Sequence, residues 1–362
     1  MNSQKILFYI SSHGFGHFAR DIIIINHLLA KNAELFVKSG IPENFFSNKI
    51  PEHYKNKFHY FETITDAGCT QKDFINIDIK KTLFEMKTVF ENNYLKIKSE
   101  IDFIKKKNIS GIISDASSFP LLIAKKSGIK NCLVTNFTWF DIYSHFPNKL
   151  KTGYNHIIDS LMNEYSCAEI QFFPGIITPN NYILNQKCIG FISGEGTDCR
   201  NKIYKKYNLK KKKICYIYFG EPDKSKFNWK NLRDNDDYIF ITKDSIETDA
   251  NVDNLIIVDD DSIGYTDMIA SSDAVCSKLG YSTIALCLRH KKPLIYCERK
   301  NFYEFDFLKK FIDENNAGSF VENKDFYNCR WGYHLTKSLQ LKTNYSKIYF
   351  NGETSIADFF EI

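Results

Sequence analysis

The sequence predicts an α/β protein built from two doubly wound domains, each a parallel sheet covered by helices on both faces. Short runs of β-branched and aromatic residues, typical of strands buried on both faces, alternate along the chain with longer helical patterns. This alternation fades over residues 176–210, which lack a strong period, and then begins again. The 362 residues suffice for two cores of ordinary size. We therefore expect two similar domains that face each other across a cleft.

The first cycle opens with an apolar run at 6–10, a buried strand that leads into a glycine turn and a largely buried helix over 22–29. Further strands are expected at 33–38, 58–64, 111–115 and 132–136, with an amphipathic helix over 73–107 and a shorter helix over 121–128. The carboxyl ends of parallel strands meet at one edge of the sheet, where ligands bind. Four polar side chains should gather at that edge: His13, His17, Asp115 and Asn136.

The second cycle has strand patterns at 214–219, 238–241, 255–258, 274–277 and 293–296, and helical patterns at 265–271, 284–290 and 302–315. A last helical pattern covers 354–360. We expect the first domain to span 1–185 and the second 186–345. The remaining segment, 346–362, is expected to pack back on the first domain.

Composition narrows the class of protein. Hydrophobic residues make up 43% and charged residues 25%, as in soluble globular proteins. No apolar run reaches the roughly 18 residues of a membrane span and the N-terminus lacks a signal-peptide pattern, so we expect a cytoplasmic protein. The net charge of +5 suits anionic ligands but is too diffuse for a nucleic-acid partner. Ten scattered cysteines without a C-x-x-C pair predict free thiols and no structural zinc site.

A first candidate site is the stretch 11–21, between the first strand and its helix. Gly14 and Gly16 let the backbone pass close to a ligand, and the helix directs its first N–H groups at the turn. His13 and His17 set this turn apart from an ordinary dinucleotide loop, because imidazole acts as a general base near neutral pH. The alternatives are histidines that fix the turn or cap the helix. Asp115 has two interpretations: it orients a base or binds the acceptor, or it is an ordinary cap of the following helical segment.

A second candidate site is the turn at 278–283. Gly280, Ser282 and Thr283 place backbone N–H groups and two hydroxyls at the start of a helix, and Lys278 adds positive charge. This combination suits a pyrophosphate group without requiring a metal ion. A tight strand-to-helix turn explains the same residues without a ligand.

Several pieces in a fixed order resemble a known family. They are His-Gly-Phe-Gly-His at 13–17 with Arg20, Ser-Asp at 114–115, Val-Thr-Asn-Phe-Thr-Trp at 134–139 with Ile-Tyr at 142–143, Tyr-Phe-Gly at 218–220, Ser-Lys-Leu-Gly-Tyr-Ser-Thr at 277–283 and the run at 299–308. Together they resemble the two-domain glycosyltransferases of the GT-B fold, with Rossmann-like domains, and within them the glycosyltransferase-like N-terminal region of plant and bacterial L-arabinokinases. The sequence ends at Ile362, before the sugar-kinase half of arabinokinases, so arabinose phosphorylation is not expected.

The resemblance implies inverting, metal-independent transfer of a sugar from a nucleotide-sugar to an acceptor hydroxyl, without a cofactor. The C-terminal domain then holds the nucleotide-sugar through the matching residues Gly220, Lys278, Gly280, Tyr281, Ser282, Thr283, Arg299 and Glu304. The N-terminal domain holds a carbohydrate, lipid-linked or protein acceptor through Gly14, Gly16, Arg20, Asn136 and Trp139. His17 takes the proton of the acceptor, with His13 and Asp115 as further catalytic residues. Peripheral contact with a membrane stays open, for example through the lysine run at 105–107.

One position departs from the family pattern. A glutamate that binds the nucleotide ribose usually follows the Gly-x-x-Thr element by three residues, but this chain has Leu286, which accepts no hydrogen bond. Glu304 or Asp306 would have to substitute, or the nucleotide is held differently. Two alternatives therefore accompany the transferase: a nucleotide-sugar hydrolase in which His17 activates water, and a non-catalytic module that binds nucleotide-sugars.

Overall fold

The computed structural model describes residues 3–220, 224–246 and 252–362, which divide into two compact units. The first unit comprises Met1–Thr70, Ile77–Ile192 and Tyr349–Ile362, and the second comprises Gln71–Asn76 and Ser193–Ile348. The boundary after the first unit thus lies at 192–193 rather than at 185–186, because one more strand joins the first sheet. No local pattern in the sequence indicates that residues 71–76 leave the first unit for the second.

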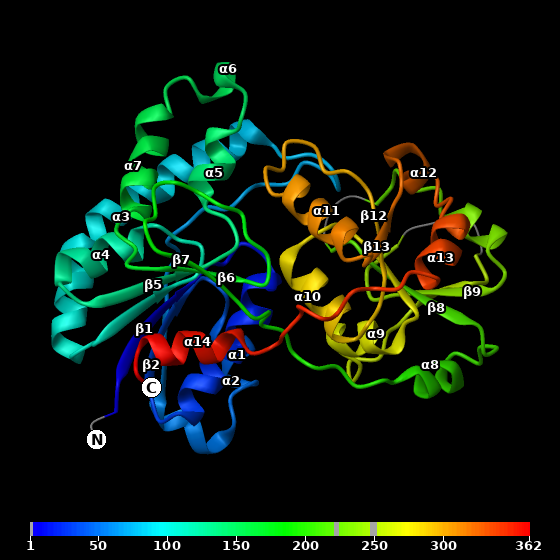
Figure 1. The fold of residues 1–362 in the computed structure, drawn as a ribbon, viewed down its shortest axis with the longest axis horizontal. Helices are drawn as coiled ribbons and strands as arrows, with labels where there is room; N and C mark the ends of the chain where they lie inside the picture. The colour runs from blue at the N-terminus through cyan, green and yellow to red at the C-terminus, as the bar shows by residue number, and fades with distance from the viewer. Residues whose placement is uncertain (1–2, 221–223, 247–251) are drawn as a thin grey trace. The chain divides into compact units, whose positions relative to one another are not determined.

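Among the described residues, seven parallel strands form the sheet of the first unit, in the order β3-β2-β1-β4-β5-β6-β7 (Figure 1). They are β1 (Lys5–Ile10), β2 (Glu34–Ser39), β3 (Phe58–Glu62), β4 (Gly111–Ser114), β5 (Lys130–Val134), β6 (Gln171–Pro174) and β7 (Gln186–Ile189). The order reverses direction between β1 and β4, where Leu7 pairs with Ile112. A reversal of this kind leaves a crevice at the carboxyl ends of the two strands, the usual ligand position in open α/β sheets.

Helices cover both faces of this sheet (Figure 1). The helical segments of the first unit are α1 (Phe15–Ala30), α2 (Glu43–Ser47), η1 (Glu52–Lys57), α3 (Ile79–Lys107), α4 (Phe119–Ser127), α5 (Trp139–Ser144), α6 (Asn148–Lys151), α7 (Asn155–Tyr165) and α14 (Gly352–Phe359). The last of these packs on α1, where Ile356 and Ala357 join the core that contains Ile24 and Leu28.

Two helices begin far from the expected residues, whereas α4, α10 (Tyr281–Arg289), α11 (Phe305–Glu314) and α14 begin within three residues of them. Helix α1 starts at Phe15, directly after Gly14, so that Gly16 and His17 lie inside its first turn. Helix α3 starts at Ile79 and not at residue 73, because the Asp78 carboxylate caps it by accepting the backbone N–H of Lys81 at 3.0 Å.

The central strands of the sheet are buried on both faces, as their apolar sequences predict. In β1, Ile6, Phe8 and Ile10 contribute to one core cluster, while Leu7 and Tyr9 contribute to the cluster on the opposite face. Burying each such side chain is worth roughly 1.5–3 kcal/mol. This packing fixes the carboxyl end of β1, and with it the turn that follows.

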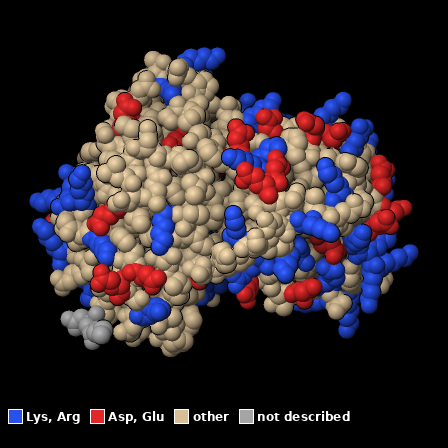
Figure 2. All heavy atoms as spheres, viewed as in Figure 1, with Lys and Arg blue, Asp and Glu red and all other residues tan. Residues whose placement is uncertain are grey.

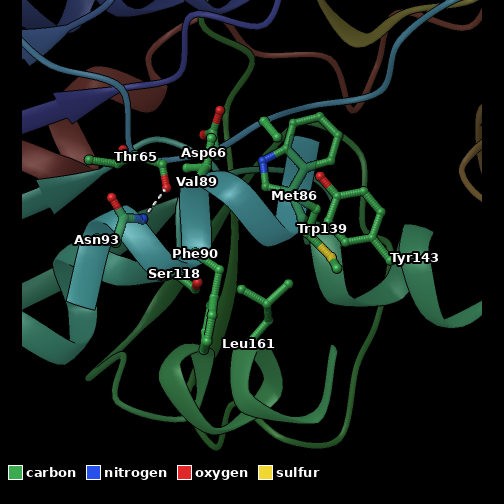
Figure 3. A pocket seen from close by; sticks show the side chains of 11 residues that line it. Thr65, Asp66, Met86, Val89, Phe90, Asn93, Ser118, Trp139, Tyr143 and Leu161 are labelled. Carbon is green, nitrogen blue, oxygen red and sulfur yellow. Dashed lines mark hydrogen bonds between the residues drawn. The ribbon is translucent and has the colours of Figure 1, made fainter. Parts of the chain in front are cut away.

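A small cavity of about 20 Å³ lies inside the first unit, among α3, α5 and α7 (Figure 3). Met86 and Phe90 line it from α3, Trp139 and Tyr143 from α5, and Leu161 from α7. The volume corresponds to about one water molecule, so this cavity as it stands is too small for a sugar ring.

In the second unit, six parallel strands of the described chain follow the order β10-β9-β8-β11-β12-β13. They are β8 (Lys213–Tyr218), β9 (Tyr238–Thr242), β10 (Leu255–Ile257), β11 (Ala274–Ser277), β12 (Leu294–Tyr296) and β13 (Gly318–Phe320). The helical segments are α8 (Arg200–Lys206), η2 (Trp229–Asp234), α9 (Tyr265–Ser271), α10 (Tyr281–Arg289), α11 (Phe305–Glu314), α12 (Asn323–Tyr327) and α13 (Gly332–Leu339). Here the order reverses between β8 and β11, so the loops after these strands border the second crevice.

The surface in Figure 2 shows basic and acidic side chains interspersed over the second unit, whereas large parts of the first unit carry few charges on that face. Within the described ranges, no helix combines the length and the apolar character that a membrane crossing requires.

Candidate functional site

The turn after β1 is shaped by Gly14. Its backbone dihedrals, φ 85° and ψ 153°, fall in a region that is almost restricted to glycine, although an added Cβ would meet no atom within 4 Å. Gly16, in contrast, lies within α1 and is not among the glycines with positive φ. The turn brings His17 into the first turn of α1 and Arg20 onto the same face, three residues further.

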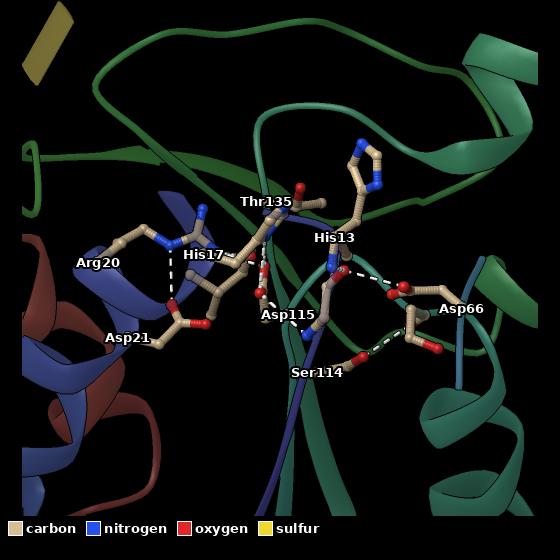
Figure 4. A network of polar contacts seen from close by, with 12 residues as sticks. His13, His17, Arg20, Asp21, Asp66, Ser114, Asp115 and Thr135 are labelled. Atoms are coloured by element: carbon tan, nitrogen blue, oxygen red, sulfur yellow. Dashed lines mark hydrogen bonds and ion pairs between the residues drawn. The ribbon is translucent and has the colours of Figure 1, made fainter. Parts of the chain in front are cut away.

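Asp115 lies directly after β4 and is fully buried. His17 Nδ1 is 2.9 Å from Oδ1 and 2.8 Å from Oδ2, the Arg20 guanidinium contacts Oδ1, and the backbone N–H of Ser11 donates to Oδ2 at 3.3 Å (Figure 4). Burial alone would raise the pKa of Asp115, but the neighbouring His17 and Arg20 hold it well below its usual range. Asp115 is therefore a carboxylate near neutral pH.

This carboxylate determines the tautomer of His17. A carboxylate only accepts hydrogen bonds, so His17 Nδ1 carries a proton and donates it to Asp115. In the neutral ring, Nε2 then holds the lone pair, and the side chain keeps 12% of its surface exposed. The arrangement suits a general base. Asp115 itself is 0% exposed, so the structure gives it contact with His17 and not with solvent.

Arg20 and Asn136 were expected to bind the acceptor, but their polar groups are used inside the unit. Arg20 Nε donates to Asp21 at 2.9 Å, and Nη2 donates to Asp115 and to the Val134 carbonyl at 3.2 Å. Burial would lower the pKa of Arg20, but the two carboxylates raise it, so it stays charged. Asn136 is buried and its Nδ2 donates to two carbonyls of the loop after β6, at 3.0 and 2.6 Å. Arg20 thus supports Asp115, and Asn136 holds a loop.

His13 and Trp139 lie together on the other side of the turn. The His13 ring points away from the cluster around Asp115 (Figure 4), and its Nε2 accepts the backbone N–H of Cys69 at 3.4 Å. The ring stands edge-on to Trp139 with centroids 5.3 Å apart and covers Gly68, where an added Cβ would lie 2.1 Å from it. Trp139 is 4% exposed and lines the small cavity. These contacts favour a role in shaping the turn.

Asp66, which was not predicted as a site residue, also belongs to this cluster and contacts Ser11 of the candidate stretch. Asp66 follows β3, and its Oδ1 accepts the Ser11 hydroxyl at 2.9 Å, while the Ser11 backbone N–H binds Asp115. Burial raises the pKa of Asp66 to about 6, against the opposing effect of His17. Ser11 therefore bridges two carboxyl groups beside the candidate base. The rule that selected Asp115, a polar residue after a parallel strand, also selects Asp66 when applied to the strand at 58–64.

In the second unit, the turn after β11 leads into α10, whose N-cap is Gly280. The φ of Gly280 is −155°, an extended value open to any residue, and an added Cβ would meet no atom within 4 Å. Nothing in the surrounding protein therefore requires glycine at this position. Tyr281, Ser282 and Thr283 form the first turn of α10, and the first turn of a helix directs its backbone N–H groups out of the helix end. The Thr283 hydroxyl lies 3.0 Å from the Tyr265 hydroxyl, which connects α10 with α9.

Two cations reach the same region from neighbouring strands. Lys278 follows β11, and Arg299 follows β12 and lies with its Cζ 3.1 Å from the centre of the Phe302 ring. Both contact the side-chain amide of Gln71. With the amide oxygen turned toward the cations, it accepts from Lys278 Nζ at 3.2 Å and from Arg299 Nη2 at 3.3 Å. The structure thus brings together Lys278 and Arg299 through Gln71, which was not among the predicted site residues.

The other predicted residues of this site lie at the same edge of the sheet. Gly220 follows β8 with φ 71°, and its backbone N–H donates to Asp244 at 3.1 Å. Glu304 directly precedes α11 and is buried, as is Leu286 within α10. In the described ranges, no group of three or more histidine, cysteine, aspartate or glutamate side chains is placed to hold a metal ion.

Comparisons with known proteins agree on the fold. No model of a protein family matches the chain. L-arabinokinase from Arabidopsis thaliana is 24% identical over 353 residues, which are 95% of this chain and 33% of that protein, so the chain spans about a third of its length. The solved structure of Arabidopsis thaliana UGT89C1 has a TM-score of 0.68 at 10% identity, covering 99% of this chain and 94% of that one.

A second structure, the glycosyltransferase SnogD from Streptomyces nogalater, has a TM-score of 0.61 at 10% identity over 99% of both chains. UGT89C1 in complex with UDP matches with a TM-score of 0.62 at 11% identity, covering 93% of each chain. The chain therefore has the GT-B fold of these glycosyltransferases, as the sequence predicted.

Proposed function

We propose that the chain transfers a sugar from a nucleotide-sugar to an acceptor hydroxyl, with inversion at the anomeric carbon and His17 as general base. The observation that carries the proposal is the contact of His17 Nδ1 with the buried Asp115 carboxylate, which leaves Nε2 as the proton acceptor. His17 removes the acceptor proton while the oxygen attacks the anomeric carbon and the nucleoside diphosphate departs. A single displacement of this kind inverts the configuration.

The departing diphosphate is assigned to the second unit. Lys278, Arg299 and the N-terminus of α10 provide positive charge and N–H groups for a developing phosphate charge. These groups support transfer that is independent of a metal ion. Because UGT89C1 was solved with UDP, UDP is the first nucleotide to test. We further propose a cytoplasmic protein whose acceptor is a carbohydrate, a lipid-linked sugar or a protein, reached in part through peripheral membrane contact.

The test begins with calorimetric titration of UDP and other nucleoside diphosphates, followed by nucleotide release from the matching nucleotide-sugars with and without a panel of acceptors. His17→Ala should lose most turnover and keep nucleotide binding. The matched control is His27→Ala, because His27 lies on the same helix outside the Asp115 cluster. If His17→Ala turned over at the wild-type rate, the assignment of the base would be wrong.

Two alternatives have an observation in their favour. The contact of His17 with Asp115 suits deprotonation of water as well as of an acceptor hydroxyl, and this favours a nucleotide-sugar hydrolase as the first alternative. Turnover without any acceptor would establish it. The buried Leu286, where the family pattern has a ribose-binding glutamate, favours a binding module. Tight nucleotide-sugar binding without turnover on any acceptor or in water would support that interpretation.

A further inference from the structure

The segment Gln71–Asn76 belongs to the second unit, although the residues on both sides of it belong to the first. Its apolar side chains anchor it there. Phe74 is 1% exposed, and its ring centre lies 4.6 Å from that of Phe219 and 5.7 Å from that of Phe326. Ile75 is buried in the same core cluster. The anchor is therefore part of the core of the second unit.

Asp73 fixes the shape of the segment. Its Oδ1 accepts the backbone N–H groups of Ile75 and Asn76 at 3.0 and 2.9 Å, and its Oδ2 pairs with Lys226 at 3.0 Å. Burial would raise the pKa of Asp73, but the Lys226 ammonium and the backbone N–H groups lower it to about 2. The Asp73 carboxylate thus remains charged over the physiological pH range, and it keeps its hydrogen bonds to the loop and to Lys226.

This loop presents the Gln71 amide to two cations. The hydrogen-bond network places the amide oxygen toward Lys278 Nζ at 3.2 Å and Arg299 Nη2 at 3.3 Å. Arg299 is largely buried against Phe302, so its guanidinium direction is fixed. A neutral amide oxygen offers hydrogen bonds to both cations but no negative charge, whereas a phosphate oxygen offers both.

We propose that Gln71 is a further residue of the nucleotide site, where its amide oxygen competes with a diphosphate oxygen for Lys278 and Arg299. The inference rests on the proposed role of these two cations in nucleotide binding. It adds a residue from the first fifth of the chain to that site. On diphosphate binding, Lys278 and Arg299 then exchange the Gln71 oxygen for a phosphate oxygen. Without an anion the Gln71 amide oxygen accepts from both cations, and it gives up these hydrogen bonds when an anion binds.

The test uses the full chain and two probes, UDP and inorganic pyrophosphate, in calorimetric titrations. Gln71→Glu places a carboxylate against both cations and should weaken the binding of both probes at least about tenfold. Lys72→Gln is the matched control, because it also lowers the net charge by one in the same loop, but at an exposed position. It should change binding by less than about twofold. Gln71→Ala removes the competitor and should bind both probes at least as tightly as the wild type.

The outcomes separate this inference from the proposed function. If UDP binds the wild type and Gln71→Glu behaves like Lys72→Gln, the nucleotide function stands and the role of Gln71 is refuted. If pyrophosphate follows the expected pattern but UDP does not bind, the role of Gln71 stands and the nucleotide function falls. A tenfold loss in Gln71→Ala would show direct contact with the ligand and contradict competition. Absence of binding for both probes overturns both proposals, and thermal unfolding verifies that each variant is folded.

Discussion

Replacing Asp115 by asparagine tests the tautomer argument directly. Asp115 accepts from three donors: His17 Nδ1, the Arg20 guanidinium and the Ser11 backbone N–H. Asparagine has nearly the same shape but offers one oxygen and one NH₂ group. Arg20 has no acceptor atom, so the single oxygen must face it. The NH₂ group then takes the place of Oδ2, 2.8 Å from His17 Nδ1, while the amide oxygen stays 2.9 Å from the same nitrogen. Moving the His17 proton from Nδ1 to Nε2 relieves the donor–donor contact and turns Nδ1 into an acceptor for the NH₂ group.

The expected loss follows from this exchange. With the proton on Nε2, the lone pair of His17 lies on Nδ1, which faces the interior, and the base is no longer available. General-base catalysis is worth 10²–10⁴-fold, and reversal of a histidine tautomer by the same substitution in a serine protease costs about 10⁴-fold. We expect kcat to fall by about 10³-fold, or about 4 kcal/mol. The Ser11 N–H also loses its acceptor, which lowers the free energy of unfolding by about 1–3 kcal/mol.

The assay measures release of the nucleoside diphosphate at saturating donor, together with calorimetric UDP binding, which should remain at the wild-type value. Asp21→Asn is the matched control. Asp21 is the other carboxyl partner of Arg20, and burial raises its pKa, so the neutral amide is a mild change there. Because Asp21→Asn leaves the His17–Asp115 contact in place, turnover should persist. Turnover of Asp115→Asn within tenfold of the wild type, or an equal loss in Asp21→Asn, would refute the reasoning.

Three further predictions concern stability. Burial raises the pKa of Asp66 to about 6, so its contribution to stability is present at low pH and is lost as the pH rises from about 4 through 6, by roughly 3 kcal/mol. Asp66→Asn should remove this part of the pH dependence of the unfolding free energy, measured in urea. An unchanged pH profile contradicts the prediction. Leu286→Glu buries a carboxylate at a 3% exposed position and should lower the free energy of unfolding by several kcal/mol. Unchanged stability together with tighter UDP binding would contradict this and place residue 286 at the ribose. Phe74→Ala should destabilise the second unit by about 3–5 kcal/mol in thermal or denaturant unfolding, and a loss below about 1 kcal/mol would show that the anchor is loose.

The sequence predicted most of the strands, because a strand buried on both faces forms a continuous apolar run, but it missed β6, β7 and β13. The runs at 6–10 and 214–219 correspond to β1 and β8. The beginnings of helices were harder, because they depend on single capping interactions. The apolar period at 73–107 continues backward through residues that are not helical, and only the Asp78 cap shows where α3 begins.

Site residues were predictable where they follow a parallel strand, because ligands bind at the carboxyl ends of such strands. They were not predictable where packing between distant segments decides which side chains meet. His17 and Asp115 follow β1 and β4 and meet as expected. The burial of Arg20 was not predictable, because a charged residue in a motif looks the same whether it faces a ligand or a second carboxylate. The role of Gln71 was not predictable either, because its partners Lys278 and Arg299 lie more than 200 residues away and no local pattern connects them.

The two units use charge in opposite ways, and this difference supports separate roles. In the first unit the Arg20 guanidinium is enclosed by the carboxyl groups of Asp21 and Asp115, so its hydrogen bonds stay inside the unit and the His17 imidazole remains as the reactive group. In the second unit Lys278 and Arg299 converge on a neutral amide, an arrangement that an anion improves. Asp115→Asn should therefore change turnover without changing anion affinity. Gln71→Glu should change anion affinity without changing which nitrogen of His17 carries the proton.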